Sequence, residues 1–389
     1  MITKDDFYKV ELVWDTYDNS HRKITINWDF IWSIQQFGEL KLTRQSPKWH
    51  SEGEFVSDHV VKVVENMVQY IESNVTAYGK HIDFQVDLLL LSAIFHDIGK
   101  CRTTFFKESD QLWHHYGHEV DGEKITRRIL WDLPIDLREG VCSLVRYHME
   151  PMSIMKSNDC VQKIHELAAK VPSMNLLYIL KRCDSKGSIA EDPTLTQNDD
   201  TVLANFMLIA SDMNCFDKKP ESFGVAKRVH HMMSRKPKIN VDLYIGLPGA
   251  GKDTAIKNDP HASEKVVISR DDIRADLGMC KQGEKKIGTD EEEKEVTRVF
   301  NERMLRAAKD GKYIVLNNMN NKRKYRDSYK AILSGYDVTW RYIICEARGL
   351  EKNIERRKGQ IAEVVFPSLV ESLDWPTPDE YDRLEFVLS

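Results

Sequence analysis

A glycine-rich segment directly after a short apolar run is the feature that most limits what this chain can fold into. The apolar run covers residues 241–245, and Gly-Leu-Pro-Gly-Ala-Gly-Lys follows it. Gly246, Gly249 and Gly251 leave backbone N–H groups free to wrap around an anion, and the helix expected behind them adds its dipole. Lys252 is placed to reach the β- and γ-phosphates of a nucleotide. The segment therefore predicts a strand, a phosphate-binding loop and a helix, in that order.

The residues after this loop depart from the usual pattern of phosphate-binding loops. A Ser or Thr normally follows the lysine and holds Mg²⁺, but Asp253 occupies that place and Thr254 comes next. Either Asp253 binds the ion, directly or through water, or Thr254 takes over that role. ATP or another nucleoside triphosphate, together with Mg²⁺, is the predicted cofactor of this half. A plain Gly-Pro turn between a strand and a helix is the alternative, and the complete glycine pattern argues against it.

The spacing of apolar residues differs between the two halves of the chain. From residue 55 to about residue 210 the apolar spacing is helical, and the run at residues 88–95 predicts a buried helix rather than a strand. After the loop, β-rich runs at residues 266–268, 314–316 and 338–344 alternate with charged helical segments. Such alternation is typical of a parallel sheet covered by helices. The predicted fold is an all-α domain followed by an α/β domain with a parallel sheet.

Two further patterns in the second half point to phosphoryl transfer. Asp271 and Arg274 are three residues apart at the start of a predicted helix, so both face the space above the strand ends. Asp271 is suited to accept a hydroxyl proton and Arg274 to hold a phosphate of the acceptor, although an aspartate there also favours a helix start by itself. Arg356 lies in a basic helical segment that is either a solvated face or a lid that neutralises charge on the transferred phosphoryl group.

The first half carries histidines and aspartates that are spread over successive helical segments. The candidate metal ligands are His59, His96, Asp97, His118, His148 and Asp184. Histidine combined with carboxylate suits Mn²⁺, Fe²⁺, Co²⁺, Ni²⁺ or Zn²⁺ better than Ca²⁺ or Mg²⁺, and a carboxylate between two ions activates water for attack on phosphate. Lys100, one turn after His96, can bring a positive charge close to the phosphate oxygens. The chain has 13 histidines, so the ordered series, rather than any single histidine, favours a site.

The order of these residues resembles the HD phosphohydrolase superfamily over roughly residues 55–190. By this resemblance His59 is the first histidine, His96 and Asp97 form the doublet, and Asp184 is the last carboxylate. The resemblance also implies that His118 and His148 are the additional histidines of members with two metal ions. His115, three residues before His118, is the alternative ligand at that position.

The motifs GLPGAGKDT, SRDDIR and KNIERR resemble the 5′-hydroxyl polynucleotide kinase branch of P-loop phosphotransferases. This resemblance implies that Lys252 is the phosphate lysine, Asp271 the general base, Arg274 the clamp on the acceptor phosphate and Arg356 the lid arginine. The chain departs from the branch at residues 317–320, Asn-Asn-Met-Asn, where related kinases usually carry an Asp. Contacts to the metal or the acceptor at that position are therefore in question.

The fused arrangement resembles bacterial HD-domain polynucleotide kinases over nearly the whole chain. It implies an end-healing enzyme that phosphorylates 5′-OH ends of RNA or DNA and hydrolyses 2′,3′-cyclic or 2′-phosphate ends, with a separate ligase as partner. A nucleoside or metabolite kinase fused to an HD nucleotide phosphohydrolase is the alternative, and a nucleotide-sensing regulator is a third hypothesis. A requirement for strand length in the acceptor separates the first two.

The length of 389 residues predicts several domains. The expected boundaries are an N-terminal extension at 1–50, an HD phosphohydrolase domain at 51–215, a linker at 216–240 and a kinase domain at 241–389. Seven dispersed cysteines without a CxxC pair favour a reducing compartment, the cytoplasm. Apolar runs are shorter than the roughly 20 residues that span a bilayer, so no membrane partner is expected. The net charge of −5 requires any nucleic-acid surface to be a local basic patch.

Overall fold

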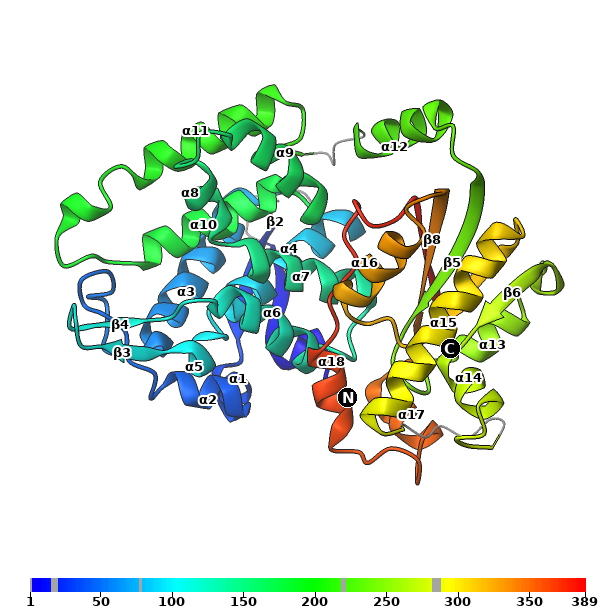
Figure 1. Ribbon diagram of the computed structural model, residues 1–389. Helices are drawn as coiled ribbons and strands as arrows, with labels where there is room; N and C mark the ends of the chain where they lie inside the picture. The colour runs from blue at the N-terminus through cyan, green and yellow to red at the C-terminus, as the bar shows by residue number, and fades with distance from the viewer. Residues whose placement is uncertain (1, 15–19, 77–78, 218–221, 282–287) are drawn as a thin grey trace. The chain divides into compact units, whose positions relative to one another are not determined.

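The structure, a computed structural model, divides into two units, Met1–Pro220 and Glu221–Ser389 (Figure 1). It describes residues 2–14, 20–76, 79–217, 222–281 and 288–389. The first unit is mainly helical and the second is built on a parallel sheet, which confirms the predicted fold class. Among the described helices, none combines the length and the hydropathy that crossing a bilayer requires.

The helices of the first unit surround one apolar core. Five central helices are α3 Val56–Asn74, α4 Lys80–Phe95, α6 His118–Ile129, α7 Ile135–Tyr147 and α10 Met174–Gly187. The others are α1 Trp28–Ser33, α2 Gln35–Leu40, α5 Lys100–Thr103, α8 Glu150–Ile154, α9 Cys160–Lys170 and α11 Asp199–Asp212, with 3-10 turns at Lys4–Asp6 and Pro193–Leu195. α4 is buried along residues 86–95 because α3, α7 and α10 cover different sides of it. The buried helix predicted at residues 88–95 is confirmed.

The first fifty residues, predicted as an N-terminal extension, pack into this same core. β1 Tyr8–Trp14 and β2 Ser20–Ile26 form an antiparallel hairpin. Phe7 and Phe37 meet Phe95 of α4 edge to face, with ring centroids 5.4 and 5.0 Å apart. Such aromatic pairs stabilise a core beyond the area that they bury. The segment is therefore a layer of the helical unit.

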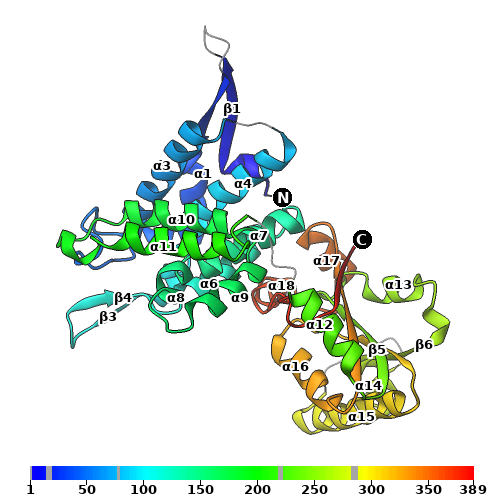
Figure 2. The same cartoon turned by 90° about the horizontal axis from the view of Figure 1, so that it is seen from above.

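A second hairpin projects from the helices of the first unit (Figure 1, Figure 2). It consists of β3 Phe105–Lys107 paired antiparallel with β4 Leu112–His114. The side chains of β3 are exposed and those of β4 are half-buried, so neither strand shows the alternation of apolar and polar residues that marks a strand in sequence. The hairpin was not among the predicted elements.

The sheet of the second unit has the strand order β6-β7-β5-β8-β9, and all four pairings are parallel. Its strands are β5 Lys238–Ile245, β6 Lys265–Ile268, β7 Tyr313–Asn317, β8 Asp337–Glu346 and β9 Arg383–Leu388. The first four contain the predicted β-rich runs, whereas β9 was not predicted. Because the sheet is parallel, the carboxyl ends of its strands meet at one edge, where ligands bind in such folds.

Helices cover this sheet, and α15 and α16 lie in front of it in Figure 1. The helices of the unit are α12 Ser222–Met233, α13 Lys252–Lys257, α14 Arg270–Asp276, α15 Asp290–Lys309, α16 Arg323–Ile332, α17 Leu350–Arg356 and α18 Val365–Glu371, with a 3-10 turn at Ala262–Glu264. α15 begins with a capping box between Thr289 and Glu292 and carries four acidic residues in its first turn, an arrangement that favours a helix start. α12 lies within residues 216–240, the stretch predicted as a linker, and the boundary between the units also falls there.

Candidate active sites

Histidine and aspartate side chains from five helices meet inside the helical unit. They are His59 on α3, His96 and Asp97 at the end of α4, His118 at the start of α6, His148 at the end of α7 and Asp184 on α10. All six are buried. The structure therefore brings together every residue that the sequence predicted as a metal ligand.

Asp97 stands between two groups of donor atoms. Its Oδ2 atom lies 3.6 Å from His59 Nε2 and 3.4 Å from His96 Nε2. Its Oδ1 atom lies 3.3 Å from His118 Nε2, which is in turn 3.3 Å from His148 Nε2. Each group could hold a metal ion, so one carboxylate would be shared by two ions.

The histidine rings are fixed through their other nitrogen atoms. The Nδ1 atoms of His96, His118 and His148 lie 2.9, 2.9 and 2.7 Å from the backbone carbonyl oxygens three residues earlier in the chain. A carbonyl oxygen can only accept, so each Nδ1–H donates and each Nε2 presents its lone pair to the cluster. Hydrogen bonds of this kind orient the imidazole ligands of metal ions.

His59 is held by a carboxylate instead, Glu52, which sequence reasoning missed. His59 Nδ1 lies 3.0 Å from Glu52 Oε1, and His59 Nε2 lies 3.0 Å from Asp184 Oδ1. Burial alone would lower the pKa of His59, but the hydrogen bonds to Asp184 and Glu52 raise it to about 9. By contrast, burial lowers the pKa of His148 to about 3, and the nearby charge of His118 acts in the same direction. His148 is thus neutral, whereas His59 would have to lose its Nε2 proton to bind a metal ion, because imidazole binds metal ions in its neutral form.

Two buried lysines balance the charge of the aspartates. Lys100 Nζ lies 2.7 Å from Asp97 Oδ2, and Lys181 Nζ lies 2.7 Å from Asp184 Oδ2. Burial opposes ionisation of both carboxyl groups, but these lysine charges and the adjoining histidines hold the pKa of each aspartate well below its usual range. Both carboxylates are therefore ionised, and with the imidazole nitrogens they form a donor set that suits divalent transition-metal ions.

His115, the alternative ligand, lines the same cavity but belongs to neither of the two donor groups around Asp97. Its Nδ1 atom is 2.6 Å from the hydroxyl oxygen of Thr104, and only its backbone oxygen serves the cluster, as acceptor for His118. Lys100 lies where the sequence expected a cation beside the metal ligands. The geometry favours His118 over His115 as the ligand.

The phosphate-binding loop joins β5 to α13 in the second unit. Gly249 and Gly251 have φ angles of +80° and +86°, which side chains rarely adopt. A Cβ atom at Gly246 would collide with the backbone oxygen of Cys345. Lys252 folds back over the loop and donates from Nζ to the carbonyl oxygens of Gly246 and Leu247, at 2.8 and 3.1 Å. The backbone therefore requires glycine at each of these three positions, because of the φ angle at two of them and of a close contact at the third.

The two unusual positions of the second half meet in space. Asn317, the last residue of β7, donates from its side-chain nitrogen to Asp253 Oδ1 at 2.7 Å. Asp253 and Thr254 are exposed on the first turn of α13. The carboxylate expected on the strand is thus found on the loop side, and an amide takes its place on the strand.

Asp271 and Arg274 are joined by an ion pair that a third residue supports. Arg274 donates from Nη1 to Asp271 Oδ1 at 2.7 Å, and from Nε and Nη2 to Glu293 of α15 at 2.7 and 2.9 Å. The hydrogen bond from Arg274 is the largest cause that lowers the pKa of Glu293 to about 2. Glu293 was not predicted, because nothing in its spacing links it to Arg274. It fixes the guanidinium that contacts Asp271.

The basic segment after β8 folds as α17, beside the phosphate-binding loop. Arg356 donates from Nη1 to the carbonyl oxygen of Gly249 at 2.9 Å and to Ser389 Oγ at 2.8 Å. Asn353 donates from its side chain to the carbonyl oxygen of Pro248 at 2.9 Å. The predicted lid arginine therefore contacts the loop that it was expected to serve.

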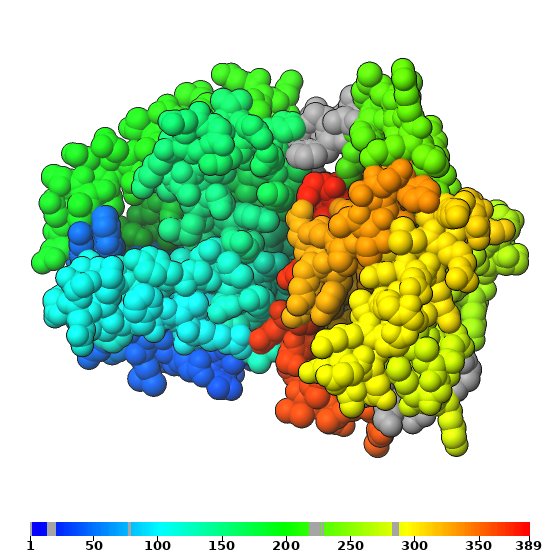
Figure 3. Space-filling model, viewed as in Figure 1, coloured from blue at the N-terminus to red at the C-terminus, as the bar shows by residue number. Residues whose placement is uncertain are grey.

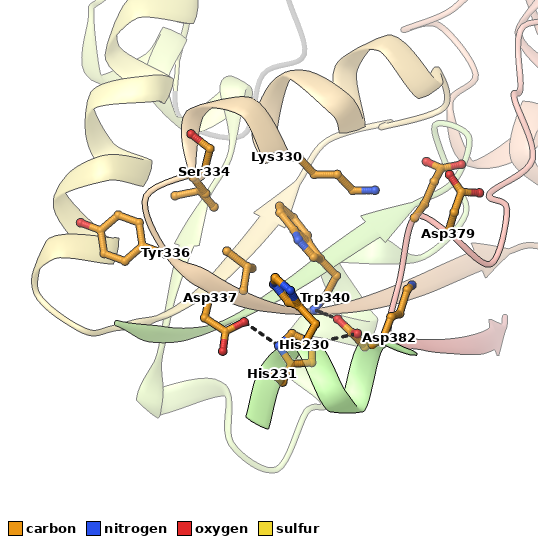
Figure 4. Close-up of a pocket in the computed structure, with 13 residues that line it drawn as sticks. His230, His231, Lys330, Ser334, Tyr336, Asp337, Trp340, Asp379 and Asp382 are labelled. Atoms are coloured by element: carbon orange, nitrogen blue, oxygen red, sulfur yellow. Dashed lines mark hydrogen bonds and ion pairs between the residues drawn. The ribbon is translucent and has the colours of Figure 1, made fainter. Parts of the chain in front are cut away.

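A cavity of about 430 Å³ in this unit lies near the amino end of β8 (Figure 4). His231 of α12 lies between two carboxylates there, with Nδ1 2.6 Å from Asp337 Oδ1 and Nε2 3.0 Å from Asp382 Oδ1. None of the predicted site residues lines this cavity. The nucleotide site is therefore expected at the carboxyl ends of the strands, not here.

Family comparisons match both units. A model of the HD domain family matches residues 56–186, and a model of the AAA domain family matches residues 241–365. No match was found among curated proteins.

Three solved structures are partly similar to the chain. One is a chain of the structure titled "Structure of the Pnkp1/Rnl/Hen1 RNA repair complex", with 19% identity and a TM-score of 0.28, over 36% of this chain and 45% of that one. A gluconokinase from Sinorhizobium meliloti 1021 has 21% identity and a TM-score of 0.28, over 40% and 84%. A chain of the "Structure of Pnkp1/Rnl/Hen1 complex" has 17% identity and a TM-score of 0.25, over 33% and 42%. This chain spans less than half the length of the repair-complex chains.

The two domain families settle the general chemistry of the chain. A P-loop kinase domain implies a nucleoside triphosphate with Mg²⁺, and an HD domain implies a divalent metal ion, for which the buried cluster supplies ligands. The chain therefore carries an HD domain followed by a P-loop domain, in the predicted order, and the two matches indicate phosphohydrolase and kinase roles.

Proposed function

We propose that this chain heals the ends of broken nucleic acid strands. The kinase half transfers the γ-phosphate of a nucleoside triphosphate to a 5′-OH end of RNA or DNA. The HD half hydrolyses a 2′,3′-cyclic or 2′-phosphate end. The products are a 5′-phosphate and a free 3′-hydroxyl, which a separate ligase joins. The observation that carries the proposal is that one chain holds both a complete metal cluster and a phosphate-binding loop with a candidate base.

In the kinase half, Asp271 accepts the proton of the attacking 5′-hydroxyl. Arg274, held by Glu293, keeps the carboxylate of Asp271 in place and offers the same guanidinium to a phosphate of the acceptor. Lys252 and Arg356 neutralise the charge that develops on the transferred phosphoryl group. The Mg²⁺ of the nucleotide binds near Asp253 or Thr254.

In the HD half, His59, His96, Asp97 and Asp184 would hold one metal ion, and Asp97, His118 and His148 a second. Ions bound there supply an activated water and neutralise phosphate oxygens. Lys100 contributes a further positive charge to the same oxygens. Because the residues of the cluster are buried, their charges interact with a phosphate more strongly than they would in water.

The test is transfer of labelled γ-phosphate to a 5′-OH oligonucleotide and, in parallel, to a free nucleoside, with Mg²⁺ present. The proposal expects labelling of the oligonucleotide alone. Labelling of the nucleoside alone would favour a nucleoside or metabolite kinase, and labelling of neither would favour a regulator.

Substitutions should separate the two activities. Lys252→Ala or Asp271→Ala is expected to abolish kinase activity and leave release of phosphate from a 2′-phosphate end unchanged. Asp97→Ala is expected to do the reverse, since it removes the carboxylate shared by both metal groups. If a single change silenced both activities in folded protein, the assignment of two independent sites would be wrong.

A further inference from the structure

The metal cluster opens into a cavity of about 690 Å³ in the first unit, which is within the usual size of small-molecule sites. Buried metal-binding residues line one part of the cavity. Trp49, His114 and Tyr116 line another part, and the side chains of Trp49 and Tyr116 are 43% and 66% exposed. A soluble protein rarely keeps such large rings at the mouth of a cavity unless they bind something. These exposed rings are therefore available to bind a ligand that enters the cavity.

Three rings pack together as the aromatic rim, which consists of Phe105, His114 and Tyr116, and the last two of them line the cavity. The ring centroids of His114 and Tyr116 are 4.9 Å apart with an interplanar angle of 31°, and those of Phe105 and His114 are 5.7 Å apart at 26°. The planes of Phe105 and Tyr116 are 55° apart at a centroid distance of 5.7 Å, so the three rings pack on one another without forming one plane. Cyan atoms of this part of the chain lie on the front face of the first unit in Figure 3. The exposed ring of Tyr116 is available to stack on a planar ligand.

The backbone fixes the rim relative to the metal ligands. Phe105 and His114 are directly opposite each other in the β3–β4 hairpin. The hairpin is tied down because Trp113 N donates to Ser46 Oγ at 2.7 Å and the Ser46 hydroxyl donates back to the Trp113 carbonyl oxygen at 3.0 Å. Tyr116 is only two residues before the metal ligand His118. A ligand on the rim is therefore next to the cluster.

Four cationic side chains also line the cavity, Lys100, Arg146, Lys156 and Lys181. Four carboxylates of the lining match them in number, Asp97, Glu119, Glu150 and Asp184, so the charge of bound metal ions would make the cavity attract a phosphate. The cavity thus combines exposed aromatic rings with residues that could hold metal ions for an anion. A nucleotide carries both a planar base and a phosphate, whereas a sugar phosphate lacks the planar part.

We propose that the HD cavity binds the terminal nucleotide of a strand, with its base stacked on the aromatic rim and its phosphate directed at the metal cluster. This names the substrate class of the HD half and rests on the proposed end-healing function. Stacking is tolerant of base identity, so the site accepts any of the four bases at the end. The rim selects for a base rather than for a particular sequence.

The test uses a single-stranded RNA with 2-aminopurine as its 3′-terminal base and a 2′-phosphate, because stacking quenches the fluorescence of this base. Wild-type protein and Tyr116→Phe are expected to quench it. Tyr116→Ala is expected to lose most of the quenching and to bind the RNA about tenfold more weakly. Tyr325→Ala, which removes a tyrosine of the other unit that is 45% exposed, is the control and should behave as wild type.

A second RNA, whose terminal nucleotide lacks a base, distinguishes the loss of base stacking from a general loss of RNA binding by the variant. It should bind wild type and Tyr116→Ala equally well. Equal weakening of both RNAs by Tyr116→Ala, or no quenching by wild type, would overturn the proposal. Quenching without hydrolysis of the 2′-phosphate would overturn the end-healing chemistry and leave base stacking in place. Hydrolysis without quenching would overturn stacking alone.

Discussion

At the scale of single residues, the kinase half differs from the usual pattern of P-loop kinases at two positions near the expected metal ion. A carboxylate stands on the loop side, at Asp253, where a hydroxyl is usual, and an amide stands on the strand, at Asn317, where a carboxylate is usual. The two side chains are hydrogen bonded at 2.7 Å. The site therefore keeps a carboxylate near the expected metal position, although a different residue provides it.

This exchange predicts that the two positions are energetically coupled. Asp253→Ser and Asn317→Asp are each expected to weaken binding of Mg²⁺–ATP, because one removes the carboxylate and the other places two carboxylates together. The double variant restores the usual arrangement and should recover part of the loss, with a coupling of about 1–2 kcal/mol. Calorimetric titration of the four proteins measures it. Strictly additive losses would show that the exchange has no functional meaning.

The carboxylate behind His59 leads to a second prediction at this scale. Glu52→Gln keeps the shape of the side chain but removes the charge that holds His59 Nδ1. Loss of such a supporting group typically weakens metal binding about 10–100-fold. Titration of the metal-free protein with Mn²⁺ or Zn²⁺ checks this value. Glu54→Gln, in the same loop but in an exposed ion pair with Arg44, is the matched control, and an equal effect there would rule out a specific role for Glu52.

The six candidate metal ligands, which the structure brings together, and the residues of the phosphate-binding loop could be proposed from sequence because each belongs to a spaced motif. Glu52 and Glu293 were not, since each supports a functional residue from another part of the chain. Their effect depends on tertiary contacts, for which spacing along the chain carries no signal. Supporting residues of this kind become visible only when the fold brings them beside their partners.

At the scale of elements, the helices and strands that could be predicted are those whose apolar residues recur with a clear spacing. The long buried helix α4 and the apolar strands β5, β7 and β8 were found because both faces of each are covered. The edge strand β9 and the β3–β4 hairpin were missed because many of their side chains are half-buried or exposed. An element with little buried surface leaves little trace in the pattern of apolar residues.

The attachment of α12 to the sheet predicts a dependence of stability on pH. Burial alone would lower the pKa of His231, but the hydrogen bonds to Asp382 and Asp337 outweigh it and raise the pKa. The stabilising contribution is therefore fully present below about pH 6.5, the unfolded value, and is lost as the pH rises through the folded value. His231→Gln should lower the melting temperature of the protein more at pH 6 than at pH 9.

The control for this pH effect is His261→Gln, since the ring of His261 is 67% exposed. Its effect on the melting temperature should be small and similar at both pH values. A destabilisation by His231→Gln that grows with pH would contradict the sign of the effect. Differential scanning calorimetry of the full chain provides both measurements.

At the scale of the whole molecule, two separate cores support two separate chemistries. The apolar core of the first unit is made of residues before 217, and the sheet of the second has its own. Ligands that bind only the folded form stabilise it by about 2.7 kcal/mol at a concentration of 100 times Kd. Each ligand should therefore stabilise only the unit that contains its site.

Calorimetry of the full chain tests this independence. We expect two unfolding transitions, of which Mg²⁺–ATP raises one and removal of the HD metal lowers the other. Asp97→Ala identifies the HD transition, because it should abolish the response to metal removal. A single transition that responds to both ligands would show that the units unfold together.

The hydrogen bonds from three rings of the cluster to backbone carbonyl oxygens three residues earlier have a consequence for the interpretation of sequence variation. His96, His118 and His148 are each oriented by the peptide group three residues earlier. The geometry of the cluster thus depends partly on the backbone positions of Ala93, His115 and Val145. A substitution that shifts the backbone at one of these positions would misorient a histidine and have the same effect as replacing that histidine. A mutational scan would therefore identify such positions as essential although their side chains bind no metal ion.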